Sequence, residues 1–167
     1  MNKELGIYIH IPFCKIKCHY CNFFSSSNKD GLISEYIDAE CKEIIDNTEI
    51  LSQRNITSIY FGGGTPSYIP SIYVKQVLDI LNLFLDKDKN IEVTLEVNPG
   101  TITKEKLQEY KNSGINRLSI GLQSTFDDIL KSIGRIHNLK DFKDTLKMVH
   151  EIGFENISVD LMYPLPN

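Results

Sequence analysis

The residues best suited to chemistry are three cysteines near the start of the chain, Cys14, Cys18 and Cys21, spaced as C-x3-C-x2-C. They follow an apolar, strand-like run, so they belong to one loop. Three clustered thiolates can bind a metal centre, and an iron–sulfur cluster normally takes four. The motif therefore predicts a cluster with one iron open to a non-protein ligand. The alternative is a zinc ion whose fourth ligand is His10 or His19.

The second strand-like run is followed by a glycine-rich turn, and the third ends with a carboxylate. The segment Gly62-Gly63-Gly64-Thr65-Pro66 lets the backbone approach a ligand closely, and the alternative is a plain strand-to-helix turn. It is not a Walker phosphate loop, because no Gly-Lys-Ser/Thr follows it. Glu96 ends the third run, where a carboxylate can accept hydrogen bonds from ribose hydroxyls, although an ordinary solvated carboxylate is the alternative.

Three further polar residues are weak signals when each is taken alone. Gln123 follows the fourth strand-like run, and Asp160 lies within the fifth. Arg135 could bind a carboxylate through two parallel hydrogen bonds, or could be an ordinary surface arginine. We expect His137 and His150 to be surface or capping histidines without a role at the site.

Strand-like and helix-like segments alternate along the whole chain and must position these residues. We expect strands over residues 5–13, 57–61, 91–97, 117–122 and 157–163, and helices over residues 32–47, 71–85, 103–113, 126–133 and 139–152. Thr103 is suited to begin a helix, whereas Gly114 and Gly153 are suited to end one. Cys41 falls on the apolar face of the first helix and is expected to be buried.

This alternation predicts an α/β fold with parallel strands, arranged as a partial TIM-like (β/α) barrel. A complete barrel takes about 250 residues, so we interpret residues 1–167 as the N-terminal portion of a longer core domain, with the C-terminal part missing. In such barrels the active site lies at the carboxyl ends of the strands, which is where the candidates above fall. Alternation along the first strand directs Tyr8 and His10 toward the lumen.

Composition excludes several classes of partner. The net charge of −4 argues against nucleic acid or an anionic membrane surface. No apolar run approaches the roughly 20 residues that span a bilayer, and the first residues do not have the layout of a signal peptide. Clustered cysteines in such a chain indicate reduced thiols, and we expect a cytoplasmic protein that is not an integral membrane protein.

Taken together, the motifs resemble those of radical S-adenosylmethionine (radical SAM) proteins. The resemblance is specifically to the oxygen-independent coproporphyrinogen III oxidase family, which includes heme chaperones of the HemW type. It covers almost the whole chain, and the matching segments are Tyr-Ile-His-Ile-Pro-Phe-Cys at 8–14, C-x3-C-x-Y-C, Gly62 to Ser67, Ser119 to Ser124, Gly134-Arg135-x-His137 and Asp160 to Tyr163.

The resemblance implies both cofactors and their ligands. Cys14, Cys18 and Cys21 would bind a [4Fe–4S] cluster, and the open iron would be chelated by S-adenosylmethionine. Reductive cleavage of that cofactor would give a 5′-deoxyadenosyl radical. Glu96 would hold its ribose and Arg135 its methionine carboxylate. The positions that match cofactor-contacting residues of the family are Tyr8, Tyr20, Gly63, Gly64, Thr65, Glu96, Gln123, Arg135 and Asp160.

Within the family two functions compete. Oxidases, which decarboxylate coproporphyrinogen III to protoporphyrinogen IX, have a further cysteine two residues after the third. Here that position is Phe23, which favours the chaperone branch, with heme, heme-acceptor proteins and an electron donor as partners. A third alternative is a damaged or truncated product with poor solubility. Pro164 stands where the family has glycine, so the backbone after the fifth strand is expected to differ.

Overall fold

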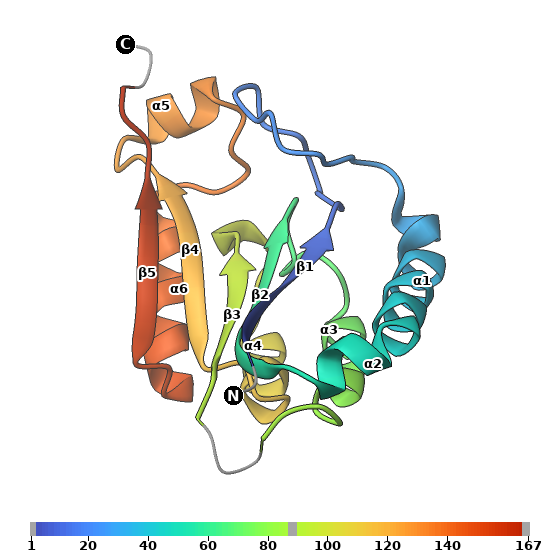
Figure 1. The fold of residues 1–167 in the computed structure, drawn as a ribbon. Coiled ribbons are helices and arrows are strands. Elements are labelled where there is room, and N and C mark those ends of the chain that lie inside the picture. Colours follow the sequence, from blue (N-terminus) through green and yellow to red (C-terminus); the bar gives the residue numbers. More distant parts are fainter. Residues whose placement is uncertain (1–2, 87–89, 165–167) are drawn as a thin grey trace.

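Five parallel strands form one open sheet in the computed structural model, which describes residues 3–86 and 90–164 (Figure 1). The strands lie side by side in sequence order, and each pairs in parallel with the next. They are β1 (Glu4–Ile11), β2 (Asn55–Gly63), β3 (Glu92–Val97), β4 (Arg117–Gln123) and β5 (Asn156–Leu161). The predicted parallel α/β architecture is therefore confirmed.

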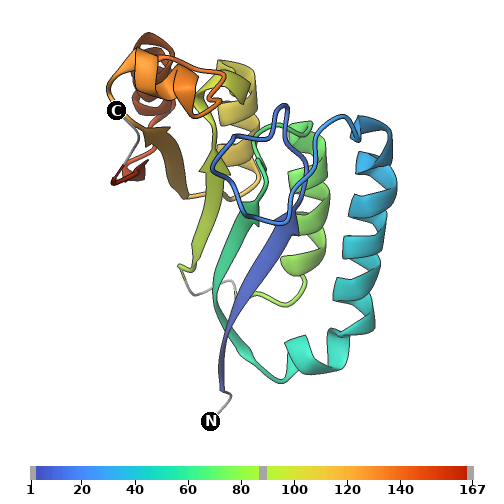
Figure 2. The same ribbon diagram turned by 90° about the horizontal axis from the view of Figure 1, so that it is seen from above.

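Helices cover the convex side of the sheet and leave the concave side open (Figure 2). The longer ones are α1 (Ile33–Asp46), α3 (Ser71–Leu81), α4 (Lys104–Asn112) and α6 (Leu139–Ile152). The short ones are α2 (Thr48–Ser52), α5 (Asp127–Ser132), and the 3-10 turns η1 (Asp30–Leu32) and η2 (Pro99–Thr101). The core lies between sheet and helices, where strand residues such as Ile11 and Phe61 meet helix residues such as Ile37 and Leu78.

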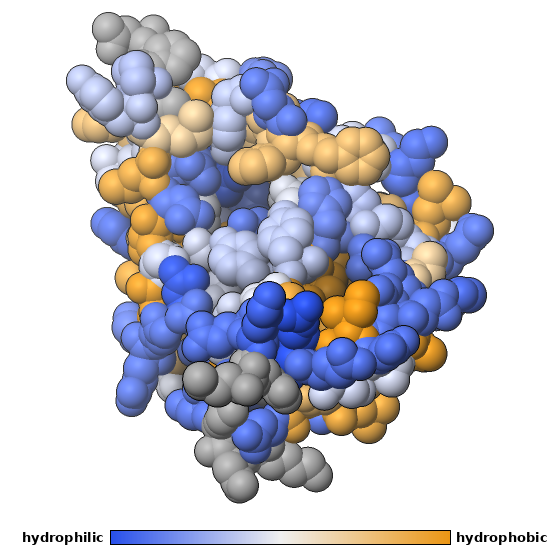
Figure 3. All heavy atoms as spheres, viewed as in Figure 1, coloured by the Kyte–Doolittle hydropathy of each residue, from blue (hydrophilic) through white to orange (hydrophobic). Residues whose placement is uncertain are grey.

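Strand β1 places apolar side chains on one face of the sheet and polar side chains on the other. Ile9 and Ile11 are buried toward the helices, as period-two alternation predicts. Tyr8 points to the concave side and is 56% exposed, and His10 on the same side is half-buried. The predicted placement of both on the inner face is confirmed. The concave side is therefore polar, and Figure 3 shows a hollow among hydrophilic side chains there.

Local capping signals act as expected. The Thr103 side chain accepts a hydrogen bond from the Lys106 amide and begins α4. Gly114 and Gly153 follow α4 and α6 with φ of +103° and +84°, a region that glycine enters without strain. Cys41 is buried on α1, as predicted.

Several expectations about boundaries were wrong. The short helix α2 was not foreseen, because five residues give too little periodicity to recognise. Helix α3 ends at Leu81 instead of residue 85, and Leu83 beyond it is exposed. Strand β5 ends at Leu161, ahead of the predicted residue 163. The segment expected to connect the helix ending at residue 85 to the strand beginning at residue 91 lies partly outside the described residues. The Tyr163–Pro164 peptide is cis.

Among residues 3–86 and 90–164, no helix combines the length and apolar character that crossing a bilayer requires.

Candidate metal and cofactor site

The cysteine loop leaves the carboxyl end of β1 and returns to pair with it. Phe13 and Ser26 form an isolated parallel bridge. The Cys14 amide donates to the Ser26 carbonyl at 2.9 Å, and the Ser26 amide donates to the Pro12 carbonyl at 2.8 Å. These bonds close the segment between them into a loop whose two ends are fixed to the sheet. Residues that must converge on one ligand are thereby held without a helix or strand of their own.

The glycine triplet lies directly against this loop. The Gly64 amide donates to the Ile11 carbonyl at 2.8 Å, and the next amide, of Thr65, donates to the Phe13 carbonyl at 2.9 Å. A Cβ added at Gly64 would lie 2.8 Å from the Pro12 carbonyl carbon and 3.0 Å from Cys14 Sγ. Glycine is required here because two backbones and a sulfur atom meet.

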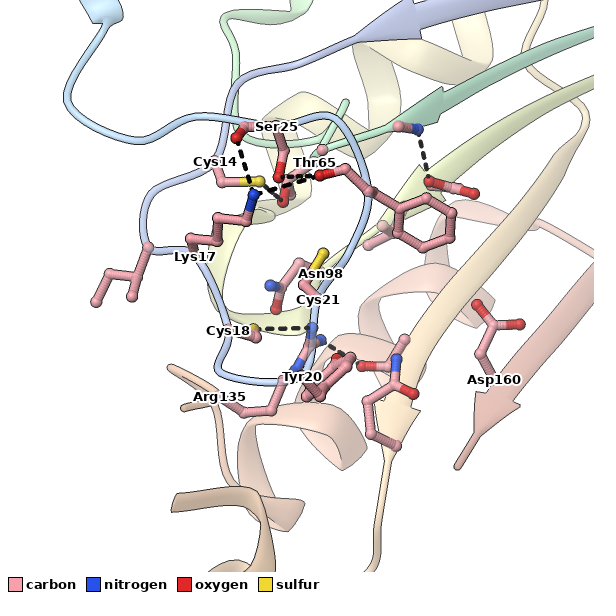
Figure 4. Close-up of a pocket in the computed structure, with 18 of the residues that line it drawn as sticks. Cys14, Lys17, Cys18, Tyr20, Cys21, Ser25, Thr65, Asn98, Arg135 and Asp160 are labelled. Carbon is pink, nitrogen blue, oxygen red and sulfur yellow. Dashed lines mark hydrogen bonds between the residues drawn. The ribbon is translucent and has the colours of Figure 1, made fainter. Parts of the chain in front are cut away.

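One cavity of about 440 Å³ lies at the carboxyl ends of the strands, and it gathers most of the candidate residues. Figure 3 shows the hollow from the concave side, and Figure 4 shows side chains of the cysteine loop, β3, β5 and the segment after α5 directed toward it. The sequence candidates that line it are Cys14, Cys18, Cys21, Tyr20, Gly63, Gly64, Thr65, Glu96, Gln123, Arg135 and Asp160. Tyr8 is absent from its described lining.

All three cysteines are free thiols facing this cavity. In Figure 4 their sulfur atoms surround the space inside the loop. Cys14 is buried and accepts a hydrogen bond from Thr65 Oγ1 at 3.4 Å. Burial raises the pKa of the Cys14 thiol, with a smaller opposing effect from the Thr65 hydrogen bond. The thiolate form therefore needs a positive partner such as a metal centre.

Glu96 projects into the cavity from the end of β3. One carboxylate oxygen accepts a hydrogen bond from the Tyr60 hydroxyl at 2.9 Å, and the other accepts from the Gly63 amide at 3.2 Å. Burial raises the pKa of Glu96, whereas these two hydrogen bonds lower it. Tyr60 was missed by sequence reasoning. Its contact with Glu96 depends on the pairing of β2 with β3, which local sequence does not indicate.

Arg135 approaches from the segment after α5. Its Nη2 donates to the Gly121 carbonyl at 2.6 Å, and its Nη1 lies 4.0 Å from Cys18 Sγ. Its Nε is buried and has no hydrogen-bond partner among the described residues. Burial raises the pKa of the neighbouring Tyr20, and the Arg135 charge opposes that rise. The unpaired Nε is a donor that an anionic ligand would satisfy.

The carboxyl ends of β4 and β5 supply the opposite side of the cavity. Gln123 has φ of +70°, unusual for a residue with a side chain, and sits at an irregularity in the β4–β5 pairing. A Cβ at Gly121 would lie 2.9 Å from Gln123 Nε2, so glycine leaves room for that amide. The Ser119 hydroxyl donates to the Asp160 carboxylate at 3.1 Å. Asn98 and Ser119 also line the cavity but were not among the predicted site residues.

The histidines do not complete a zinc site. His10 Nε2 donates to the Phe24 carbonyl at 2.8 Å, which leaves Nδ1 to accept from the Tyr8 hydroxyl at 3.3 Å. His19 Nδ1 donates to the Ser132 carbonyl at 3.1 Å. Among residues 3–86 and 90–164, no three His, Cys, Asp or Glu side chains are grouped to hold one metal ion. Three free thiols around an open space, with a buried cationic donor beside them, fit a larger cluster with one non-protein ligand.

Two other placements bear on the site. His137 is buried, contrary to the expectation of a surface or capping histidine, and bridges Asn98 and the Leu122 carbonyl. Packing of the segment after α5 against β4 buries it, which local sequence could not indicate.

Phe23 lines the cavity and remains 68% exposed.

Comparison with known proteins agrees with this geometry. The Heme chaperone HemW of Bacillus subtilis (strain 168) is 41% identical over 160 residues, which cover 95% of this chain and 42% of that protein. The Heme chaperone HemW of Escherichia coli (strain K12) is 34% identical over 98% of this chain and 43% of that protein. The chain thus spans about two fifths of the length of these curated relatives.

Solved structures and the family comparison point the same way. The coproporphyrinogen III oxidase HemN from Escherichia coli, described as a radical SAM enzyme, superposes with a TM-score of 0.90 at 28% identity, over 99% of this chain and 38% of that chain. The radical SAM superfamily matches residues 8–167. The chain therefore belongs to the radical SAM superfamily, which implies a [4Fe–4S] cluster and S-adenosylmethionine as its cofactors.

Proposed function

We propose that this chain is the cofactor-binding portion of a HemW-like heme chaperone. The observation that carries the proposal is Phe23, which lines the cavity where oxidases of the family have a further cysteine. The curated relatives named Heme chaperone HemW, at 34–41% identity, support the same choice. On this proposal the protein is cytoplasmic, binds heme, delivers it to acceptor proteins, and takes electrons from a separate donor.

The proposal assigns the metal ligands to the three cysteines. Cys14, Cys18 and Cys21 hold the cluster through their thiolates and leave one iron without a protein ligand. The support is that all three are free and line one cavity. The Arg135 guanidinium, next to Cys18, reduces the electrostatic cost of placing a negatively charged centre there.

The remaining polar residues bind and orient S-adenosylmethionine. Glu96, held by Tyr60 and the Gly63 amide, accepts hydrogen bonds from ribose hydroxyls. The buried Nε of Arg135 donates to the methionine carboxylate. The rest of the set surrounds the same ligand: Tyr20, Gly63, Gly64, Thr65, Gln123 and Asp160. Tyr8 acts from outside the cavity lining, through His10, which binds the cysteine loop.

When bound together, the cluster and S-adenosylmethionine supply reductive cleavage of a carbon–sulfur bond and a 5′-deoxyadenosyl radical. The chain's own contribution is to orient this pair and to limit the access of water. Buried Cys14 and Thr65 close the cavity on the side of β1 and β2.

The second candidate is an oxygen-independent coproporphyrinogen III oxidase. Its specific support is the TM-score of 0.90 against HemN from Escherichia coli. Both functions require the same cofactors, so the ligand assignments do not separate them. Phe23 separates them, because a phenyl ring supplies no thiolate at the position of the oxidases' additional cysteine.

The test uses the full-length protein reconstituted anaerobically with iron and sulfide. Heme binding is measured by titration in the visible spectrum, and coproporphyrinogen III turnover is measured separately by chromatography. Heme binding without porphyrinogen turnover supports the chaperone. Conversion to protoporphyrinogen IX would establish the oxidase instead, and a Phe23→Cys variant shows whether this position governs the difference.

A further inference from the structure

Lys106 on α4 extends its side chain into the turn that follows the glycine triplet. Its Nζ donates to the Ser67 carbonyl at 2.7 Å and to the Ile69 carbonyl at 3.0 Å. The carbonyls of Tyr68 and Thr101 lie at 3.2 and 3.4 Å. One ammonium group is thus surrounded by four backbone carbonyls, of which it can satisfy three at a time. Inward-pointing carbonyls repel one another unless a cation lies between them.

The side chain is half-buried, and burial lowers the pKa of Lys106, whereas the Glu109 charge one turn along α4 raises it. Glu109 also accepts a hydrogen bond from the Ser71 hydroxyl at the start of α3. Two side chains of α4 therefore bind the second half of the connection between β2 and α3 and the first residue of α3. The four carbonyls compensate the desolvated ammonium, which accounts for a lysine at a half-buried position.

The turn bound by Lys106 is continuous with the cofactor cavity. The Tyr68 amide donates to the Thr65 carbonyl at 2.9 Å, and Thr65 Oγ1 donates to Cys14 Sγ at 3.4 Å. The Ser67 hydroxyl accepts a hydrogen bond from the Asn98 backbone amide at 3.0 Å. Thr65 and Asn98 both line the cavity, from the segments that follow β2 and β3 respectively. The position of the Ser67–Ile69 backbone thus determines where Thr65 and Asn98 lie in the cavity.

We propose that Lys106 is a positioning residue for S-adenosylmethionine: its ammonium fixes the turn at residues 67–69, which places Thr65 and Asn98 against the cofactor. The inference rests on the proposed function, because it concerns the cofactor assigned to this cavity. It adds a residue that does not line the cavity. The contribution of Lys106 to S-adenosylmethionine binding should depend on its positive charge and its N–H donors more than on its aliphatic stem.

The same helix supplies a matched control. Lys104 is two residues away and exposed, and its Nζ pairs with Glu151 at 2.8 Å on the outer surface. Lys106→Met keeps the length of the stem but removes all three donors. Lys104→Met makes the identical change where no carbonyl of the turn is bound. Lys106→Arg keeps the charge and the donors.

The experiment uses the full-length protein with its cluster reconstituted anaerobically. Three quantities are measured for each variant: bound iron and sulfide, the equilibrium dissociation constant for S-adenosylmethionine, and the change that the cofactor causes in the electron paramagnetic resonance spectrum of the reduced cluster. Melting temperature is recorded as well.

The proposal expects Lys106→Met to retain its iron and sulfide and to bind S-adenosylmethionine at least about tenfold more weakly, since charged hydrogen bonds are lost. The spectral change at the concentration that saturates the wild type should be diminished, Lys106→Arg should recover most of the affinity, and Lys104→Met should match the wild type. Unchanged affinity in Lys106→Met overturns the inference alone. Loss of iron together with a general fall in melting temperature also overturns it, because that result indicates only a folding role. A wild-type protein that fails to bind the cofactor overturns the proposed function and this inference together.

Discussion

Replacing Gly64 by alanine tests the close contact between the glycine triplet and the cysteine loop. The added Cβ would lie 2.8 Å from the Pro12 carbonyl carbon, 2.9 Å from the Ile11 carbonyl oxygen and 3.0 Å from Cys14 Sγ. Two of these three atoms belong to backbone, which cannot rotate away as a flexible side chain does. The variant must therefore shift one loop against the other.

The expected cost follows from what that shift disturbs. Overpacking a well-packed site costs about 1–3 kcal/mol. Separating the loops also weakens the bond from the Gly64 amide to the Ile11 carbonyl, at 2.8 Å, and such a bond is worth about 1 kcal/mol. We expect the free energy of unfolding to fall by about 2–4 kcal/mol, and cluster content to fall because Cys14 is displaced.

The assay is urea denaturation together with iron and sulfide analysis after reconstitution. Gly31→Ala is the matched control, because a Cβ there meets nothing within 4 Å. An unfolding free energy for Gly64→Ala within about 0.5 kcal/mol of the wild type, with full cluster content, would refute the account of this contact.

Three further predictions follow from the structure. Glu96→Gln should weaken S-adenosylmethionine binding about tenfold by equilibrium titration, because an amide accepts at only one atom; wild-type affinity would contradict the ribose role. Thr103→Ala should lower unfolding free energy by about 1 kcal/mol in urea, and no loss would show that the cap is not stabilising. Burial, assisted by the Arg135 charge, lowers the pKa of His137 to about 4. The unfolded state then binds the extra proton, so His137 should cost about 2 kcal/mol of stability at pH 5 relative to pH 7.5. His137→Gln should remove this loss of unfolding free energy between pH 7.5 and pH 5, and the control variant His150→Gln should keep it. The same pH dependence of unfolding free energy in both variants would contradict the role of His137.

Much of the architecture could be predicted because local patterns and tertiary packing agree. Alternation of Ile9 and Ile11 with Tyr8 and His10 identifies the two faces of β1 without any long-range information. The capping chemistry of Thr103 likewise locates the start of α4. The barrel rule then places residues at the carboxyl ends of parallel strands on one edge of the sheet.

What could not be predicted depends on contacts between distant segments. His137 is buried because the segment after α5 packs against β4, and no local pattern indicates that. Tyr60 reaches Glu96 only through the pairing of β2 with β3. The four carbonyls around Lys106 come from two different loops, so the sequence around the lysine carries no sign of them.

The most direct test of the central claim is metal analysis of the anaerobically reconstituted full-length protein, combined with electron paramagnetic resonance of its reduced form before and after S-adenosylmethionine is added. The account predicts iron and sulfide in equal amounts, a [4Fe–4S] signal that the cofactor alters, and loss of both when Cys14, Cys18 and Cys21 are replaced by alanine. Stoichiometric zinc without sulfide, or a cluster whose signal ignores S-adenosylmethionine, would contradict it.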